Sequence, residues 1–246
     1  LHIPLRYGEN PHQKAGFYKD SEANLMLQIQ GKELSYNNIN DVDAAFDLVS
    51  EFDNGTFACA IVKHANPCGV ALGESQDEAY RKAFNCDQAS AFGGIIALNT
   101  CIEKETAELI LNTFTEVLIA PDCTEESKKL LQKNKALRVL LTGDLSKQNN
   151  FSLTWKKVHG GVLLQEEDNN AISLNDIKVV TRKVPKDTEL VDLMFAWKVA
   201  KHVKSNAIVL VKDQSTIGIG AGQMSRVDSS RVAVRKLNEM INSLNL

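Results

Sequence analysis

The sequence predicts an α/β fold built in layers, in which helices cover a buried sheet. Two patterns support this prediction. Short apolar runs of strand length alternate with longer stretches in which apolar residues recur at helical spacing. The short runs are also apolar at consecutive positions rather than at every second one, as expected for strands that are covered on both faces. We therefore expect a buried sheet that is largely parallel or mixed.

Four strands and four helices are expected in the first half of the chain. The strand-length apolar runs lie at 57–62, 94–98, 117–120 and 137–141. The predicted helices cover 41–52, 75–84, 103–113 and 124–133. The second of these helices begins at Ser75, and Glu78 three residues later fits the pattern of a capping box.

The second half begins with a polar stretch at 143–150, which we expect to be a surface connection. Residues 151–165 predict a hairpin that turns around the sequence HGG. The chain then continues through a helix at 188–203, a strand at 207–211, a second short strand, a glycine-rich loop and a final helix at 227–244. The candidate domain boundary therefore lies after residue 145.

Composition limits the classes of function. The chain has 246 residues, 43% hydrophobic and 24% charged, with a formal net charge of −3. This balance gives no overall basic field for nucleic-acid binding, so any anionic ligand must be met by local groups. No apolar run is long enough to cross a membrane, and we expect a cytoplasmic protein. The five cysteines are odd in number and form no C-x-x-C pair, so neither a disulfide framework nor a zinc knuckle is indicated.

The segment KHANPCG at 63–69 is the first candidate for chemistry. It places Lys63 and His64 at the end of a buried strand, before a turn bounded by Pro67 and Gly69, and ligands bind at strand ends in open α/β sheets. A cation beside an imidazole can stabilise developing negative charge and leave the ring available as a base, which acyl transfer to a weak amine needs. Taken alone, the pair also fits a solvated charge beside a hydrogen-bonded turn residue.

Three further segments can contact a ligand, and each also has a purely structural interpretation. IGIGAGQMSR at 217–226 has three alternating glycines before a helix, but it lacks the spacing of a dinucleotide site or a P-loop. RYGENPHQ at 6–13 can offer a guanidinium and a phenol to a phosphate, or it can form a surface arm. ASAFGGII at 89–96 opens a strand with two glycines, which permit either a close ligand or tight packing.

Taken together and in order, five segments resemble the motif series of AICAR transformylase, the C-terminal half of the bifunctional purine biosynthesis proteins. They are RYGENPHQ, KHANPCG, SAFGGIIALN, EVLIAP and SNAIVLVKDQSTIGIGAGQMSR, and they extend from residue 6 to residue 226. An ordered series of this length is far more specific than any single motif. The resemblance implies formyl transfer from 10-formyltetrahydrofolate to the 5-amino group of AICAR in IMP biosynthesis.

The resemblance also implies an architecture. The family has a cytidine-deaminase-like α/β fold in duplicate with a small helical insertion, and it works as a homodimer whose active sites use both subunits. Residues 1–145 would then be the first α/β unit. Residues 146–246 would hold a linker, the hairpin, the helical insertion and the start of an incomplete second unit.

The same resemblance implies catalytic and binding roles for individual residues. Lys63 matches the lysine that stabilises the transition state, and His64 matches the histidine that accepts a proton. Arg6 and Tyr7 match a pair that reaches the nucleotide from the partner subunit.

The remaining site residues implied by the resemblance concern ligand binding. Gly93, Asn206 and Arg226 match nucleotide contacts. Glu116 falls where some members have an aspartate, so a carboxylate is kept. Val227 matches an apolar contact to the folate.

The chain also departs from the family pattern. Family members carry an inosinate cyclohydrolase domain before the arginine-tyrosine motif, and they continue beyond Arg226 into a unit with a Phe-Pro-Phe-Arg motif that does not occur here. The expectation is therefore a fragment without cyclohydrolase activity, which binds nucleotide but by itself transfers formyl groups negligibly. The alternative is a catalytically inactive module for nucleotide binding or dimerisation.

A metal-dependent alternative follows from the fold likeness, because zinc deaminases use H-x-E and P-C-x-x-C sequences. His64 and Cys68 superficially echo both. However, Asn66 stands where the glutamate would be, and no cysteine lies three residues after Cys68. We expect no catalytic metal, although family members are known to bind an alkali cation, so a structural potassium ion is among the expectations.

Overall fold

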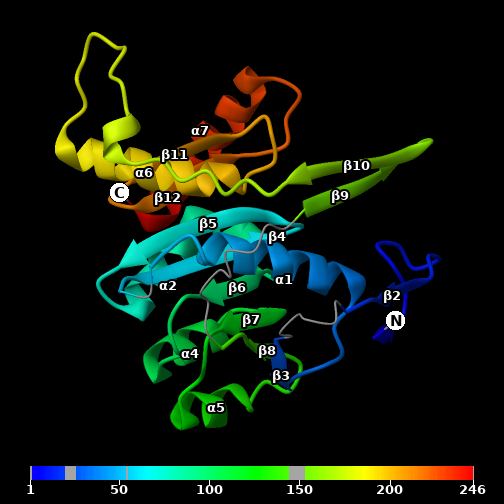
Figure 1. The fold of residues 1–246 in the computed structure, drawn as a ribbon. Coiled ribbons are helices and arrows are strands. Elements are labelled where there is room, and N and C mark those ends of the chain that lie inside the picture. Colours follow the sequence, from blue (N-terminus) through cyan, green and yellow to red (C-terminus); the bar gives the residue numbers. More distant parts are fainter. Residues whose placement is uncertain (1, 20–25, 54, 144–152, 246) are drawn as a thin grey trace.

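A computed structural model describes residues 2–19, 26–53, 55–143 and 153–245 of the chain. Its centre is an eight-stranded mixed sheet with helices on both faces (Figure 1), so the predicted α/β class is confirmed. The strand order is β11-β12-β5-β4-β6-β7-β8-β3. Apart from residue 143, the predicted surface connection at 143–150 lies outside the described residues.

The four strands predicted in the first half form the middle of this sheet. They are β4 (Phe57–Lys63), β6 (Ile95–Leu98), β7 (Val117–Ala120) and β8 (Arg138–Leu141). Every residue of β6 and β7 is buried, which explains their uninterrupted apolar sequence. β7 runs parallel to β6 and β8, whereas β4 runs antiparallel to both of its neighbours. The sheet is therefore mixed.

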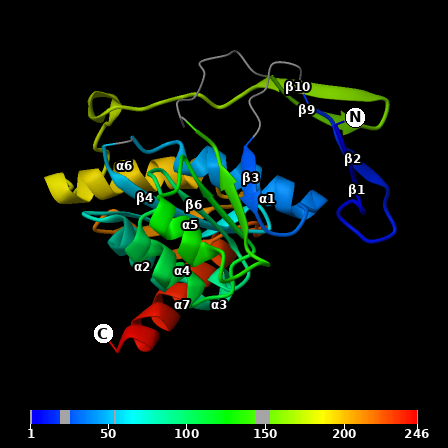
Figure 2. The same ribbon diagram turned by 90° about the horizontal axis from the view of Figure 1, so that it is seen from below.

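Two hydrophobic cores lie on the opposite faces of the sheet, and Figure 2 shows the two helical layers. One core is covered by α1 (Tyr36–Val49) and α6 (Asp187–Lys201). The other is covered by α2 (Gln76–Cys86), α4 (Lys104–Leu111) and α5 (Glu125–Leu131). All five helices were predicted, with ends that differ by a few residues.

Capping residues explain the early start of α1 and test the cap predicted for α2. α1 begins five residues before its predicted start because Ser35 and Asn38 form a reciprocal capping box. In α2, the Ser75 side chain accepts a hydrogen bond from the backbone N–H of Glu78, as predicted. The Glu78 carboxylate, however, accepts from the backbone N–H of Glu74 at 2.8 Å rather than from that of Ser75. The capping box predicted at Ser75 is therefore wrong in its second half.

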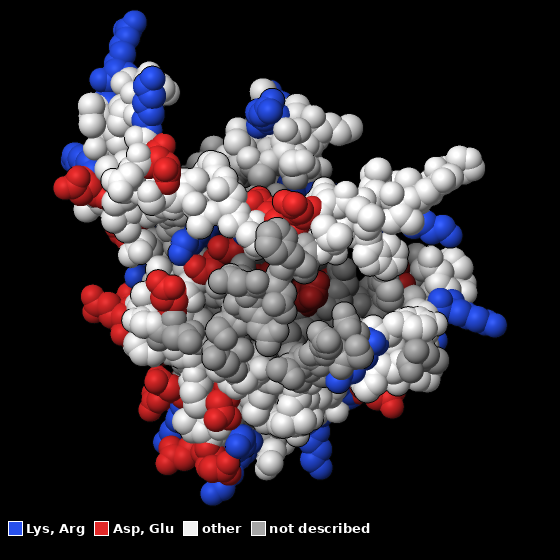
Figure 3. Space-filling view, viewed as in Figure 1, with Lys and Arg blue, Asp and Glu red and all other residues white. Residues whose placement is uncertain are grey.

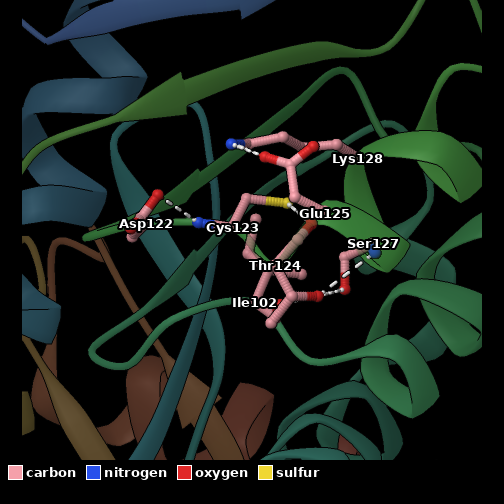
Figure 4. A network of polar contacts seen from close by, with 7 residues as sticks. All are labelled: Ile102, Asp122, Cys123, Thr124, Glu125, Ser127 and Lys128. Carbon is pink, nitrogen blue, oxygen red and sulfur yellow. Dashed lines mark hydrogen bonds and ion pairs between the residues drawn. The ribbon is translucent and has the colours of Figure 1, made fainter.

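A polar network fixes the start of α5 against the loop after β6 (Figure 4). The Thr124 hydroxyl accepts from the Ser127 backbone N–H at 3.2 Å, and the buried Ser127 hydroxyl donates to the Ile102 carbonyl at 2.9 Å. Ile102 also forms a parallel bridge with Cys123. The cap thus ties two neighbouring loops together at the ends of β6 and β7.

The strand β5 (Asn66–Gly73) was not predicted, because Pro67 and Gly69 indicate a turn. β5 instead pairs with β4 along its whole length, with a register irregularity between Ile61 and Val62 that accommodates the proline. Gly69 is needed because a Cβ there would lie 1.9 Å from the carbonyl oxygen of Ala83 in α2. The turn itself consists of only His64 and Ala65.

The second half adds β11 and β12 to the same sheet and forms a separate two-stranded hairpin. The predicted hairpin is confirmed as β9 (Leu153–Val158) and β10 (Gly161–Glu166), which extend away from the main body (Figure 1). β11 (Ile208–Lys212) and β12 (Ser215–Gly220) follow, and α7 (Arg226–Leu244) packs on them. Among the described residues, no helix is long and apolar enough to span a membrane. The main sheet contains strands from both sides of residue 145, and the domain division there remains a prediction.

Several short elements were not predicted. β1 (Ile3–Leu5) and β2 (Ala15–Phe17) form a small N-terminal hairpin, and β3 (Leu27–Gln30) is the edge strand beside β8. The remaining ones are the single-turn helix α3 (Gln88–Ala91) and the 3-10 helix η1 (Leu174–Asp176). Each is too short for its periodicity to be recognised.

Replacing Thr216 with valine is expected to lower the free energy of unfolding by about 2 kcal/mol, because a buried donor and acceptor lose their partner. The Thr216 hydroxyl accepts from the Val70 N–H at 2.9 Å and donates to the Val70 carbonyl at 3.1 Å, and so joins β12 to β5. Urea unfolding would measure the change. Thr154→Val, on the exposed face of β9, is the control, and equal curves for the two variants would contradict the prediction.

Candidate functional site

A pocket of about 180 Å³ lies where β4 turns into β5. It is lined by Lys63, His64, Asn66, Pro67, Cys68, Asp87, Ser90, Ile219, Ala221 and Lys236. A larger and more open hollow of about 540 Å³ runs along α7 and includes Val227, but it contains neither Lys63 nor His64. We take the smaller pocket as the candidate site because both predicted catalytic side chains line it.

The turn that carries His64 has an uncommon backbone. His64 and Ala65 have φ angles of 55° and 54°, in the left-handed region that a two-residue β-hairpin turn requires. Residues with a Cβ adopt this region at a cost of roughly 1–2 kcal/mol each. The turn must therefore be held by contacts with its surroundings.

Side chains on both sides hold this turn. The Asp41 carboxylate, on α1, accepts from the backbone N–H of His64 at 3.1 Å and from that of Ala65 at 2.8 Å. On the other side, the Asn66 amide donates to the His64 carbonyl at 3.2 Å and accepts from the Lys204 backbone N–H at 3.0 Å. The His64 side chain itself is exposed, and among the described residues no hydrogen bond holds its ring.

Lys63 connects the turn to the segment that contains Gly93. Its ammonium group donates to the Phe92 carbonyl at 2.7 Å. Gly93 has a φ of 73°, and its backbone N–H donates to the Phe114 carbonyl at 2.7 Å. The rings of Phe92 and Phe114 lie 5.3 Å apart, with 58% and 48% of these residues exposed. An open aromatic surface thus adjoins Lys63, and no pattern in the sequence singles out these two phenylalanines.

Glu116 immediately precedes β7, and it lies at the same end of the strands as Lys63. Its carboxylate accepts from the Asn38 side chain at 2.7 Å, and its backbone N–H donates to the Gly94 carbonyl at 3.1 Å. Asn38 lies on α1 three residues before Asp41, so both residues project from one side of that helix. α1 therefore contacts both Glu116 and the turn that carries His64.

The predicted residues Asn206, Arg226 and Val227 gather at the N-terminus of α7. The Asn206 side chain donates to the carbonyls of Gln223 and Met224 at 2.9 and 3.1 Å, and the Ser229 hydroxyl donates to the Asn206 carbonyl at 2.7 Å. Arg226 and Val227 are exposed in the first turn of the helix. This cluster is linked to the His64 turn through the bond between Asn66 and Lys204.

Arg6 and Tyr7 lie on the N-terminal arm and are not joined to the other predicted site residues. The Arg6 guanidinium donates to the Tyr7 hydroxyl at 3.1 Å and lies 4.8 Å from the centre of its ring. The arm touches the body where the Asn37 side chain donates to the Glu9 carbonyl at 3.3 Å. Within the described part of the chain, no hydrogen bond or ion pair connects Arg6 or Tyr7 with Lys63 or His64.

A largely shielded ion pair in the pocket was not predicted. Lys236 of α7 lies 2.7 Å from the Asp87 carboxylate, and the two side chains are only 17% and 10% exposed. Asp87 also caps α3 by accepting from the Ser90 backbone N–H at 3.1 Å. Lys236 has no neighbouring motif in the sequence, so only the packing of α7 reveals its place.

The charge around the pocket is local. On the face of the molecule in Figure 3, acidic and basic side chains are interspersed and the basic ones form no continuous surface. The pocket brings together the ammonium groups of Lys63 and Lys236 with the single carboxylate of Asp87. An anionic ligand would therefore be met by local groups, as the composition predicts.

Cys68 lines the pocket as a thiol. Its sulfur donates to the Ile61 carbonyl at 3.4 Å, and burial raises the pKa of Cys68 to about 12. All five cysteines are free. Within the described ranges, no group of three or more His, Cys, Asp and Glu side chains is placed to hold a metal ion.

The glycines of the segment 217–226 mainly serve packing. A Cβ on Gly218 would lie 2.3 Å from the carbonyl oxygen of Ala233, and one on Gly220 would lie 1.9 Å from that of Ser229. Both positions thus let α7 approach β12 closely. A Cβ on Gly222 would meet only the Lys204 Cδ, at 4.0 Å, so the φ of 66° is what favours glycine there.

Comparison with known proteins shows to which family the chain is similar. Residues 2–236 match the family model described as the AICARFT/IMPCHase bienzyme. The bifunctional purine biosynthesis protein PurH of Paracoccus denitrificans is 58% identical over 247 residues, that of Dinoroseobacter shibae 57% over 248, and that of Roseobacter denitrificans 56% over 247. Each alignment covers 98% of this chain and 47% of the relative, so the chain spans about half the length of these curated relatives.

Proposed function

Because the chain belongs to the AICARFT/IMPCHase bienzyme family, we propose that it contributes the formyl-transfer site of a purine biosynthesis enzyme. The reaction moves a formyl group from 10-formyltetrahydrofolate to the 5-amino group of AICAR. The observation that carries this proposal is the position of Lys63 and His64, which line one pocket at the carboxyl end of β4. β4 runs antiparallel to β6, so β6 and β7 begin at this end of the sheet and bring Gly93 and Glu116 to the same side.

His64 is the proposed proton acceptor. As the amine nitrogen of AICAR attacks the formyl carbon, it forms a C–N bond and must lose a proton, which an accessible imidazole can take. The His64 side chain is exposed at the pocket while its backbone is held on both sides, so the ring can meet a substrate from a fixed position. The proton is then transferred from the imidazole to the folate nitrogen as the bond between that nitrogen and the formyl carbon breaks.

Lys63 is the proposed electrostatic stabiliser. Attack on the formyl carbon places negative charge on the formyl oxygen, and a positioned cation lowers the energy of that state. The bond to the Phe92 carbonyl uses one of the three N–H groups of the ammonium, which leaves two for a ligand. The same bond directs the Lys63 side chain toward the segment that contains Gly93.

The proposed ligand contacts surround this pair. Gly93 would approach the nucleotide through its backbone, and Asn206 and Arg226 would bind it from the start of α7, where helix amides favour an anion. Glu116 would contact the nucleotide from the start of β7, and Val227 would give an apolar contact to the folate.

We expect the protein to be a homodimer in which Arg6 and Tyr7 serve the partner's site. In the N-terminal arm, Ile3 is 46% and Tyr18 71% exposed, and an arm that reaches a second subunit would bury such side chains. Sedimentation velocity should therefore show a dimer. A monomer at micromolar concentration would contradict the proposed role of the arm.

The deciding experiment is a formyl-transfer assay with 10-formyltetrahydrofolate and AICAR on the full-length protein. Turnover that is lost in both Lys63→Ala and His64→Ala would support the proposal. If the unsubstituted protein binds the nucleotide but shows no turnover, the alternative is favoured, a catalytically inactive nucleotide-binding or dimerisation module.

A further inference from the structure

The turn of His64 and Ala65 is held by one carboxylate that accepts both of its backbone N–H groups. The Asp41 oxygens lie 3.1 Å from the His64 nitrogen and 2.8 Å from the Ala65 nitrogen. Two successive left-handed residues direct their N–H groups to one side, which makes a small concave anion site. Asp41 fills that site with a charged acceptor, and such bonds are stronger than those to a neutral one.

The chain contains the same arrangement a second time. Asp213 and Gln214, between β11 and β12, both have a φ of 51°. The Asp192 carboxylate, on α6, accepts from their backbone N–H groups at 3.0 and 2.7 Å. In both places a helix carboxylate closes a two-residue left-handed turn between antiparallel strands.

The two turns differ in what lies beside them. The Gln214 carbonyl accepts from the Leu72 backbone N–H at 2.9 Å, so the second turn lies near the far end of β5 from Asn66. Neither Asp213 nor Gln214 lines the pocket around Lys63. The turn at His64, by contrast, forms part of that pocket. The second turn therefore serves as an internal control. It is held by the same kind of contacts but carries no predicted catalytic side chain.

We propose that Asp41 is a positioning residue for His64. Its carboxylate fixes the left-handed turn, and the turn directs the imidazole to the pocket beside Lys63. This inference rests on the proposed function, in which His64 accepts the proton. Without the carboxylate, the two N–H groups lose their common acceptor, the turn samples other conformations, and the imidazole spends less time in the reactive position.

The test compares Asp41→Ala with Asp192→Ala in the full-length protein. Asp41→Ala is expected to lower kcat by about 10- to 100-fold, the scale of a small misplacement of a reacting group, with KM little changed. Asp192→Ala is expected to leave kcat unchanged. In each variant, hydrogen exchange at the two amides of the affected turn should become at least about tenfold faster.

Asp41→Asn retains one carbonyl acceptor and is the fallback if Asp41→Ala does not fold. It should show a smaller loss of kcat. If hydrogen exchange at the His64 and Ala65 amides is unchanged in the Asp41 variants, the Asp41 carboxylate does not fix the turn, whatever reaction the protein catalyses. Faster exchange with unchanged kcat, in a protein that His64→Ala inactivates, would overturn the positioning role and leave the proposed function intact. If His64→Ala also keeps its turnover, the proposed function fails and the positioning role fails with it.

Discussion

Replacing His64 with alanine is expected to lower kcat for formyl transfer by roughly 10²- to 10⁴-fold, the usual contribution of a general base. The imidazole is the exposed end of a residue whose backbone is already held by Asp41 and Asn66. Its removal should therefore leave the turn in place and change chemistry rather than folding. Steady-state kinetics with both substrates, together with urea unfolding of the same samples, would measure the two effects.

His159→Ala is the matched control for this prediction. His159 is also an exposed histidine in a two-residue hairpin turn, between β9 and β10, but it lies outside the candidate pocket. The control should retain full turnover and stability. A decrease in kcat smaller than about tenfold for His64→Ala would show that another group accepts the proton.

The sequence predicts the central strands well because burial on both faces leaves a simple signal. β6 and β7 are apolar at every position, and no competing pattern occurs there. The prediction missed β5 because its sequence contains residues that usually indicate a turn. Pro67 and Gly69 are usually turn residues, yet Pro67 fits at a register irregularity and Gly69 makes room for a backbone carbonyl of α2. Both causes involve contacts with other elements, which a single segment of sequence does not contain.

The candidate site shows the same limit. Lys63 and His64 are adjacent in the chain, so one short segment reveals them together. The residues that hold or complete the pocket come from elsewhere: Asp41 from α1, Asp87 from the end of α2, and Lys236 from α7. None of these three belongs to a motif that suggests a role. They could be found only when the sheet order brings α1 and α7 to the ends of β4 and β12.

The glycine-rich segment illustrates why a motif needs its structural context. Its alternating glycines suggest a backbone that approaches a ligand, but Gly218 and Gly220 face carbonyl oxygens of α7. The close approach is between a strand and a helix. In the proposed function this packing matters indirectly, because α7 carries the proposed nucleotide contact Arg226 at its start and holds Asn206 through Ser229.

Gly220→Ala is accordingly expected to lower the free energy of unfolding by about 3 kcal/mol, at the upper end of the usual cost of overpacking. The added Cβ would lie 1.9 Å from the Ser229 carbonyl oxygen, and backbone on both sides leaves no flexible side chain to move. α7 must therefore shift away from β12. Because the Ser229 hydroxyl donates to the Asn206 carbonyl, the shift should also weaken nucleotide binding.

Thermal and urea unfolding of Gly220→Ala would be compared with those of Gly161→Ala and Gly222→Ala. Gly161 has nothing within 4 Å of its built Cβ and should change stability by less than about 0.5 kcal/mol. Gly222 has room for a Cβ, which would lie 4.0 Å from the Lys204 Cδ, but its φ is 66°, so alanine there should cost roughly 1–2 kcal/mol from backbone strain alone. The expected order of loss is thus Gly220, Gly222, Gly161. If Gly220→Ala unfolds like Gly161→Ala, contact with α7 does not explain the glycine, and the segment would regain its interpretation as a ligand-binding loop.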